Sequence, residues 1–396
     1  MHIFADTETR RFRASCMAPP VVCIQWCVDD GPAYLMTARG EFAHQSGSLS
    51  GPTENTFPSL LAYWLNQGAT LVGHNIAYDL ACLCALDQAL LPLVFRAYRE
   101  NRITDTMWRQ KLADIGRGRY RGFIEHGVFI PLQYDLGSVG GRHGYKVNKD
   151  DPWRLHYDLL ADVPLASWPD VHVEVPKLKN DEPETDALGQ PVLVTLQGGD
   201  AIKYALGDPI ATRAAFVGQA QRYEPALLVD EFNQARKFWS LQLMSVWGLR
   251  TSLRGVLELE RGAIARRDEL GVMLREHKLV RDDGTRDTKA AQARMREVCT
   301  RDGLTLRLTK KNEVCLDSDA CNSSGDPVLE AYTEFSSMTK VITNDVAALR
   351  RGVVVPVHPH FDLAKTSRVT ASKPNSMNPR RLAGVRECYV PRGYQG

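Results

Sequence analysis

The strongest constraint on the fold is the alternation of strand-like and helix-like segments in the N-terminal part of the chain. Short runs rich in apolar residues, separated by polar turns that contain glycine and proline, have the composition of strands at residues 1–6, 21–28 and 32–38. Residues 57–66 and 76–90 have helical apolar spacing, and the strand-like run TLVGHN lies between them. Strands that alternate with helices predict an α/β domain that starts with a sheet.

A Pro-, Gly- and acid-containing stretch at 171–199 interrupts this pattern. We expect an insertion there, in the form of a β-hairpin that turns at 188–190. A helix over about 200–222 follows it. The first domain is therefore expected to cover residues 1–222, with 171–199 as its insertion.

The second half of the chain is mostly helical. Long segments rich in Leu, Arg and Glu are followed by shorter ones, and we expect helices at 225–247, 253–277, 288–302 and 326–350. A length of 396 residues suits more than one core at about 150 residues per domain. We expect a helical domain over 223–351 and a Pro- and Val-rich, irregular segment over 352–396.

The charge of the chain is unevenly distributed. The net charge is only +2, but residues 351–396 hold eight Lys and Arg residues against Asp362 and Glu387. A basic tail on an otherwise slightly acidic protein is typical of a surface that binds phosphate backbones. A solvated or disordered end would have the same composition.

The cysteines and the N-terminus indicate a soluble cytoplasmic protein. Nine scattered cysteines do not form a disulfide framework in a chain of this length. No apolar run has the length of a membrane span, and no apolar signal region precedes Asp6. Cys23-x3-Cys27 and Cys82-x-Cys84 could hold zinc. Buried structural thiols are favoured, because the chain does not have two CxxC pairs that could form one zinc site together.

Asp6 and Glu8 form the first candidate metal site. They stand two apart on the first expected strand, so both carboxylates leave the same face and can share a cation. The pattern alone is weak, because other acidic pairs of the same spacing, such as Glu258/Glu260, occur in the chain. It gains weight from the acidic residues described next.

Two further segments place polar side chains where an α/β sheet collects its active site. Asn75 and Asp79 lie at the join between an expected strand and helix, and strand ends are where such sites form. Tyr204 and Asp208 stand one helical turn apart on one face. Taken singly, Tyr204 would be a core aromatic and Asp208 a helix cap; their joint order favours a shared cleft.

Carboxylates grouped in this way suit phosphodiester hydrolysis. Two divalent cations held by them lower the pKa of a water and neutralise charge on the leaving oxygen. Oxygen ligands favour Mg²⁺ or Mn²⁺. The sequence therefore predicts a nuclease-type metal centre.

The same residues resemble the DnaQ-like 3′–5′ exonucleases of the DEDDy type, in particular the proofreading domain of family A DNA polymerases. Asp6-Thr7-Glu8-Thr9 resembles the first family motif, His74-Asn75 through Asp79 the second, and Tyr204-x3-Asp208 the third. Asp105-Thr106-Met107 resembles a strand-to-helix step between motifs. The resemblance implies an RNase H-like fold for the first domain.

The second half resembles the thumb of phage-type family A polymerases. Residues 366–381, TSRVTASKPNSMNPRR, resemble a primer-template-contacting block: Arg368, Pro374, Asn375 and Asn378 match it, whereas Ser367, Thr370, Ala371 and Met377 depart from it. The resemblance implies contacts with primer-template DNA through Thr366, Arg368, Lys373, Asn375, Asn378, Arg380 and Arg381. Residues 352–396 are expected to be the start of a polymerase palm.

The resemblance also implies a role for each site residue. Asp6, Glu8 and Asp208 would hold one ion, and Asp6 with Asp79, through water, the second, about 4 Å away. Tyr204 would orient the attacking water, because a phenol with a pKa of about 10 is a poor base. Thr7, His74 and Asn75 would contact the terminal nucleotide. Single-stranded 3′ ends would be preferred, because fraying a duplex costs free energy.

The family's palm carboxylates and fingers would follow a segment like RECYVPRGY at 386–394, where this chain nears its end. We therefore expect no polymerisation by the chain alone. A split polymerase with a separate palm and fingers chain, an interrupted gene and an artificial boundary remain alternatives, as do a non-catalytic DNA-binding subunit and an RNase D-like exoribonuclease. The phage-like thumb suggests a viral protein in a host cytoplasm.

Overall fold

The computed structural model describes residues 1–13, 16–44, 56–146, 151–179, 182–186, 188–309, 312–373, 375–377 and 384–391. Internal contacts divide the chain into two compact units. The first unit comprises Met1–Trp247 with Phe361–Thr370, and the second comprises Gly248–His360 with Ala371–Gly396. Each unit is described by itself.

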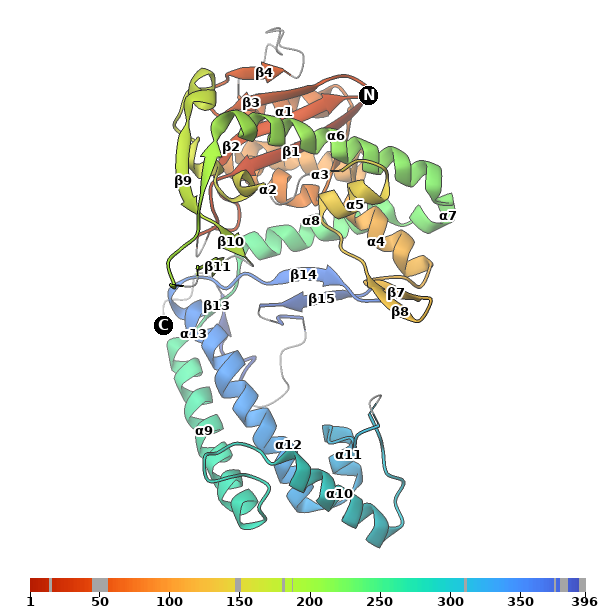
Figure 1. The fold of residues 1–396 in the computed structure, drawn as a ribbon, viewed down its shortest axis with the longest axis vertical. Helices are drawn as coiled ribbons and strands as arrows, with labels where there is room; N and C mark the ends of the chain where they lie inside the picture. Colours follow the sequence, from red (N-terminus) through yellow and green to blue (C-terminus); the bar gives the residue numbers. More distant parts are fainter. Residues whose placement is uncertain are drawn as a thin grey trace. The chain divides into compact units, whose positions relative to one another are not determined.

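A mixed six-stranded sheet organises the first unit (Figure 1). Its strands, in spatial order, are β4 (Phe42–His44), β3 (Ala33–Thr37), β2 (Val21–Val28), β1 (His2–Thr9), β5 (Thr70–Gly73) and β6 (Ile103–Asp105). β1 is antiparallel to β2 and parallel to β5. β1 therefore lies inside the sheet, with both of its faces available for side chains.

One face of the sheet packs against a layer of helices. These are α1 (Phe57–Asn66), α2 (Ile76–Leu86), α3 (Leu91–Arg99) and α8 (Glu231–Trp247). α1 starts at a capping box in which Thr56 and Ser59 satisfy each other's backbone N–H groups. Ile3, Ile24 and Trp26 of the sheet share a buried core with Leu60 of α1 and Leu80 of α2.

The opposite face of the sheet is covered by α6 (Gly198–Arg222), which packs across β1, β2, β3 and β5. Turns of 3₁₀ helix at Pro152–Leu155, Tyr157–Leu159 and Leu165–Asp170 complete this layer. They contribute the fully buried side chains of Trp153, Tyr157 and Trp168. These side chains pack with Ala201 and Ala205 of α6 in one core.

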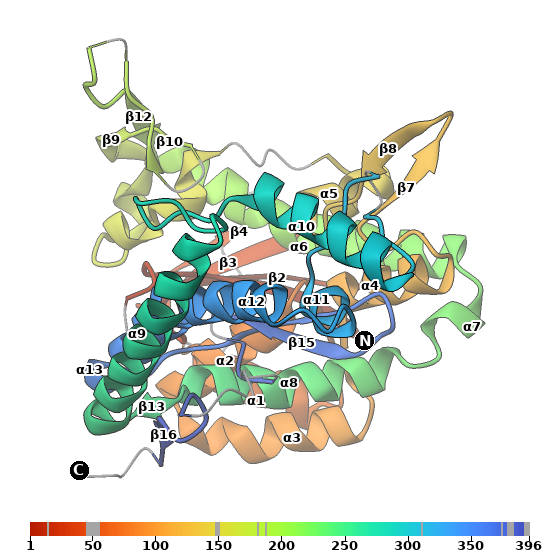
Figure 2. The ribbon, with the colours of Figure 1, turned by 90° about the horizontal axis from the view of Figure 1, so that it is seen from below.

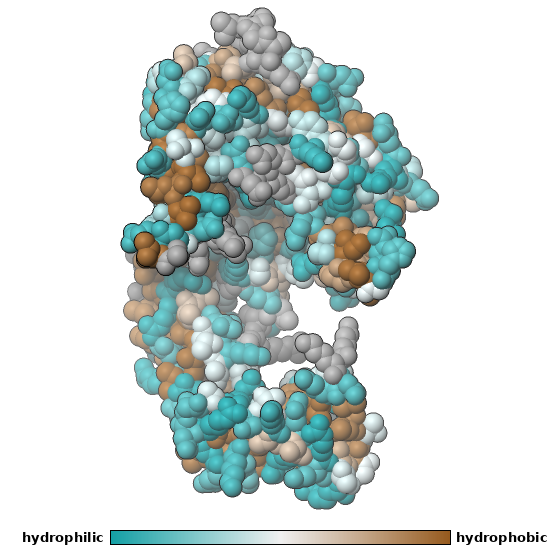
Figure 3. Space-filling model, viewed as in Figure 1, coloured by the Kyte–Doolittle hydropathy of each residue, from teal (hydrophilic) through white to brown (hydrophobic). Residues whose placement is uncertain are grey.

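The remaining elements of the first unit lie around the sheet. They are α4 (Thr106–Gly116), the hairpin β7–β8 (Gly122–Glu125, Val128–Pro131), α5 (Leu136–Arg142), β9 (His172–Pro176), β10 (Leu178–Lys179), β11 (Glu182–Pro183), β12 (Leu193–Gln197) and α7 (Pro225–Leu228). The β7–β8 hairpin extends away from its unit (Figure 2), and Figure 3 shows an apolar surface over it.

The second unit is mostly helical. Its long helices α9 (Leu253–Glu276) and α12 (Pro327–Lys340) pack along each other. Its other helices are α10 (Thr288–Asp302), α11 (Ser318–Ser323), a π-helical turn (Val341–Val346) and α13 (Ala347–Val354). Its short strands β13 (Arg250–Thr251) and β16 (Tyr389–Val390) pair with each other. A hairpin of β14 (His360–Leu363) and β15 (Val369–Ser372) has residues that are assigned to each of the two units.

The expected α/β class of the N-terminal part is confirmed, and the helical character of the second half is found. The division between the units falls at Trp247/Gly248, whereas the sequence placed a boundary after 222. α8 accounts for the difference, because Ala235 and Trp239 are buried in the core of the first unit. None of the helices in the described ranges has the length and apolar run that a bilayer crossing requires.

Candidate metal centre

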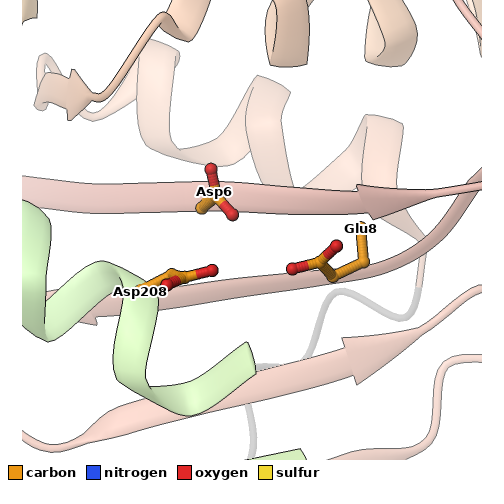
Figure 4. Close-up of side chains that lie close together, drawn as sticks. All are labelled: Asp6, Glu8 and Asp208. Atoms are coloured by element: carbon orange, nitrogen blue, oxygen red, sulfur yellow. The ribbon is translucent and has the colours of Figure 1, made fainter. Parts of the chain in front are cut away.

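A trio of carboxylates forms the centre of the site. Asp6 and Glu8 come from β1 and Asp208 comes from α6 (Figure 4). Each offers a carboxylate oxygen, and these oxygens all lie within 4.8 Å of one another. In the part of the chain that the structure describes, this is the one group of three or more carboxylate, imidazole or thiol side chains close enough to hold a metal ion.

The trio arises from two simple features of the sequence. Along β1, alternate side chains face opposite sides of the sheet, so Asp6 and Glu8 both face α6. α6 presents alanines to the sheet, and Ala205, Ala211 and Ala215 are fully buried. Such small side chains let the helix lie close to the strands, so that Asp208 reaches the carboxylates of β1.

Gln25 supports this arrangement from the neighbouring strand. It is the residue directly opposite Asp6 in the antiparallel pair β1–β2. Its side-chain amide donates a hydrogen bond to Asp6 Oδ2 over 2.8 Å, and the side chain is completely buried. Gln25 was not among the residues predicted from the sequence, although a lone polar residue in the apolar run VVCIQWCV is a signal that could have revealed it.

Asp79 reaches the site from the other side of β1. It lies in the first turn of α2, and its Oδ1 accepts hydrogen bonds from the backbone N–H and the hydroxyl of Thr7. Thr7 faces away from Asp6 and Glu8 because it stands between them on the strand. Asp79 is 6% exposed and lines the same cleft as the trio, without being part of it.

The carboxylates destabilise one another's charged forms. Burial raises the pKa of Asp6 to about 7. Burial, followed by the charges of Asp6, Asp208 and Asp79, raises the pKa of Glu8 well above its usual value. Burial and the charge of Asp6 act in the same direction on the pKa values of Asp79 and Asp208. Such a group is stabilised by a cation, and its all-oxygen donor set fits Mg²⁺ or Mn²⁺.

Tyr204 stands one turn before Asp208 on α6, and both line the cleft. Burial, followed by the negative charges of Asp208 and Glu8, raises the pKa of its phenol far above the ordinary value. The hydroxyl therefore keeps its proton at neutral pH. It can donate a hydrogen bond but cannot act as a base.

His74 and Asn75 join β5 to α2. Both ring nitrogens of His74 have protein neighbours, Thr106 Oγ1 and the carbonyl oxygen of Tyr134, each at 2.9 Å. Asn75 adopts a left-handed conformation with φ of 64° and is exposed at the cleft. Of the three residues expected to contact the terminal nucleotide, Thr7, His74 and Asn75, only Asn75 is exposed.

Asp105 explains how this junction is held. It accepts backbone N–H groups from Asn75 and Ile76 at the start of α2, and from Met107 and Trp108 at the start of α4. Burial raises its pKa to about 6 despite these four bonds. Asp105, which the resemblance placed between motifs, therefore has a structural role: it fixes the first turns of α2 and α4.

A cleft of about 830 Å³ surrounds the carboxylates. Its lining also includes the cationic side chains of Lys111, Arg121 and Arg154, which sequence analysis did not single out. Lys111 pairs with Asp362 over 2.7 Å, and Arg121 pairs with the other oxygen of Asp362 at 3.0 Å. Negative and positive side chains in one cleft suit a substrate that carries phosphate groups bridged by metal ions.

The described residues that were expected to contact primer-template DNA are not among those that line the cleft. Thr366 and Arg368 are exposed between β14 and β15, and neither lines the cleft. Lys373 and Asn375 are exposed in the second unit. Pro374, Asn378, Arg380 and Arg381 lie outside the described residues.

The cysteines do not form a metal site in the described part of the chain. All nine are free thiols, and the Cys23, Cys27, Cys82 and Cys84 side chains are buried. Burial raises the pKa of Cys27 to about 11. These cysteines pack in the core as structural thiols.

No protein-family profile and no curated protein matches the chain. A solved structure that is similar in fold is the POL domain of Pol1 from M. smegmatis, in complex with DNA primer-template and dNTP. The TM-score is 0.55 at 15% sequence identity, and the match covers 100% of this chain and 56% of that one. The chain thus resembles a DNA polymerase domain in fold and spans little more than half of its length.

Proposed function

We propose that this chain is a metal-dependent 3′–5′ exonuclease that removes nucleotides from DNA 3′ ends, as the proofreading portion of a family A DNA polymerase. The proposal includes an RNase H-like fold for the first unit and a thumb-like role for the second. The observation that carries it is the convergence of Asp6, Glu8 and Asp208 within 4.8 Å. Tyr204 and Asp79 line the same cleft.

The carboxylates would hold the metal ions. Asp6, Glu8 and Asp208 would ligate one ion, and Asp6 with Asp79, through water, would ligate a second. Bound divalent ions supply an activated water and offset the charge that develops on the leaving oxygen. Gln25 keeps Asp6 oriented through the hydrogen bond to Oδ2.

Tyr204 would position the attacking water. Its hydroxyl stays protonated because burial and the neighbouring carboxylates raise its pKa. A protonated phenol at the edge of the trio can donate a hydrogen bond to a water and hold it in line with a phosphorus atom. Asn75 and Thr7 would receive the terminal nucleotide beside it.

The fold similarity supports DNA as the substrate. The similar structure was solved with a DNA primer-template, and the sequence of the second half resembles the thumb of such enzymes. The exposed cations Arg368 and Lys373 are available for phosphate contacts. Binding to duplex DNA is then expected to weaken steeply with salt.

The direct test uses 5′-labelled oligonucleotides with single-stranded, mismatched or paired 3′ ends, incubated with Mg²⁺ or Mn²⁺. Stepwise shortening from the 3′ end is expected, and it should cease with EDTA or with Asp6→Asn. Glu258→Gln is the matched control, because Glu258 belongs to an acidic pair of the same sequence spacing and carries an exposed side chain on α9. Shortening that persists in Asp6→Asn would reject the assignment.

The same assay separates the two alternatives. An RNase D-like enzyme would shorten RNA and leave DNA intact. A non-catalytic DNA-binding subunit, which the fold similarity to a polymerase domain also supports, would bind primer-template without shortening any substrate.

A further inference from the structure

The β7–β8 hairpin exposes apolar side chains beside the cleft. Ile124, Val128 and Phe129 are 74%, 64% and 60% exposed. They account for the apolar surface over this hairpin in Figure 3, on an element that extends away from its unit in Figure 2. Clustered exposed apolar side chains mark a surface that meets a partner.

The base of the hairpin is hydrogen-bonded to neighbouring segments and forms part of the cleft wall. Tyr120 is 4% exposed and donates a hydrogen bond to the carbonyl oxygen of Leu363 over 2.6 Å. The Tyr134 hydroxyl accepts the backbone N–H of Arg121 at 3.2 Å. The chain that leaves β8 runs directly into the cleft lining at 131–137. The base of the hairpin is therefore anchored in the wall of the cleft that holds the carboxylates.

The exposed phenyl ring is held in position by a glycine. Gly122 has φ of 141°, a conformation that other residues rarely adopt, and a Cβ there would collide with Cζ of Phe129. The ring of Phe129 thus lies across Gly122. Ile124 stands directly opposite Phe129 in the strand pair, so the two side chains share one face. The apolar face is preformed.

The charges around the hairpin favour a nucleic acid as its partner. Arg117, Arg119 and Arg121 precede it directly, while its strands and turn carry one acidic residue, Glu125. The Arg119 guanidinium lies 4.7 Å from the centroid of Phe123, and in the described part of the chain it forms no ion pair. Arginines beside exposed aromatic and aliphatic side chains are typical of surfaces that bind phosphates and stack on bases.

We propose that the β7–β8 hairpin is a wedge that separates the last base pairs of a DNA duplex, so that the 3′-ended strand can enter the cleft. Apolar side chains inserted between base steps unstack them, and Ile124 and Phe129 are placed to do so. The inference rests on the proposed nuclease function and deepens it. It explains how a cleft that accepts single strands acts on a paired end.

The cleavage test compares a single-stranded oligonucleotide with the same strand fully paired. Ile124→Ser/Phe129→Ser is expected to lower the rate on the paired 3′ end about tenfold or more, with the rate on the single strand unchanged. Ile124→Ser alone leaves the contact of Phe129 with Gly122 intact and is expected to give a smaller loss of the same kind. Leu188→Ser is the matched control, because Leu188 is 85% exposed on the 171–199 insertion.

A binding measurement tests the wedge without cleavage. The Asp6→Asn protein is mixed with a duplex that carries 2-aminopurine at the 3′-terminal pair. The fluorescence of 2-aminopurine is expected to rise when the Asp6→Asn protein has the native hairpin. It is expected to stay low when the same protein also carries the Ser substitutions in the hairpin. The wedge would be overturned if the ratio of the rate on the paired end to the rate on the single strand were the same in all variants. It would also be overturned if the Ser variants gave the same rise in fluorescence as the native hairpin. Either result would leave the hairpin as a surface for a protein partner. Failure of every protein to cut single strands would reject the nuclease function instead.

Discussion

The Thr7 hydroxyl donates a hydrogen bond to Asp79 Oδ1 over 2.6 Å, and the backbone N–H of Thr7 donates to the same oxygen at 3.1 Å. Both residues are buried. Because Thr7 stands between Asp6 and Glu8 on β1, these bonds tie α2 to the strand that carries the carboxylate trio. The bonds from Thr7 thus help to fix the Asp79 carboxylate relative to the trio.

Thr7→Val should loosen this tie while keeping the shape of the side chain. We expect the free energy of unfolding to fall by about 1 to 3 kcal/mol, because a buried hydrogen bond to a carboxylate is lost. The cleavage rate should fall as well, because Asp79 loses one of the two hydrogen bonds from Thr7 that orient it. Thr7→Ser, which keeps the hydroxyl, should recover most of both. Denaturant unfolding and the 3′-end assay measure these effects, and equal behaviour of the Val and Ser variants would contradict the role of the hydroxyl.

The raised pKa values of the carboxylates predict a pH-dependent stability. Burial raises the pKa of Asp6 to about 7, so the folded protein binds a proton that the unfolded chain releases near pH 4. Without metal, stability should therefore fall as pH rises from about 4 to about 7. Divalent ions bind the deprotonated carboxylates, so the rise in melting temperature on adding Mn²⁺ should be larger at about pH 8 than at about pH 5.5.

Asp208→Asn provides the control for this prediction. It removes one of the three repelling charges, so the metal-free variant should be more stable than the native protein at about pH 8. Its melting temperature should respond only weakly to Mn²⁺. A native protein whose response to Mn²⁺ does not change with pH would show that the trio does not hold the ion.

Lys111 and Asp362 provide a test of packing near the cleft. The Lys111 side chain is 8% exposed, and its Nζ lies 4.0 Å from the Trp108 ring centroid and 2.7 Å from Asp362 Oδ1. Asp362→Ala would leave this ammonium buried without its carboxylate, and we expect a loss of about 3 kcal/mol in unfolding free energy. Glu258→Ala, which breaks an exposed pair with Arg254, should cost less than about 0.5 kcal/mol. Equal losses in the two variants would contradict the role of burial.

The pKa of Asp362 gives this pair a pH signature. Burial acts to raise that pKa, but the charge and hydrogen bond of Lys111, together with the backbone N–H of Leu363 and the charge of Arg121, hold it below the usual value. The stability from the pair is thus complete above the unfolded pKa of about 4 and is lost as pH falls through the lower folded value. The difference in stability between the native protein and Asp362→Ala should shrink below about pH 4.

The sequence predicted the parts of the site that depend on local periodicity. Asp6 and Glu8 share a face because a strand alternates, and Tyr204 and Asp208 share one because a helix turns. Contacts between distant segments produce no periodic pattern in the sequence. Lys111 and Asp362, for example, are 251 residues apart. The helical spacing of α8 likewise indicated a helix without showing that Trp239 is buried against the first unit.

Arg154 is a residue that only the folded chain places at the site. It is exposed on the turn Pro152–Leu155 and lines the cleft. Its charge acts to lower the pKa values of Glu8 and Asp208, and it forms no ion pair among the described residues. A guanidinium near the trio that is not engaged in an ion pair with a described residue is available for a substrate phosphate.

Arg154→Gln should therefore weaken substrate use without affecting folding. We expect kcat/KM on a single-stranded oligonucleotide to fall about tenfold, the usual scale for one lost charge-assisted hydrogen bond. Arg154→Lys should retain part of the rate, since it keeps the charge but not the two-pronged geometry. The decisive comparison uses an oligonucleotide with an uncharged methylphosphonate next to its 3′ end. The native protein should bind the methylphosphonate strand less well than the normal strand. Arg154→Gln should show a smaller difference in affinity between the two strands. An equal difference in both proteins would show that Arg154 does not contact that phosphate.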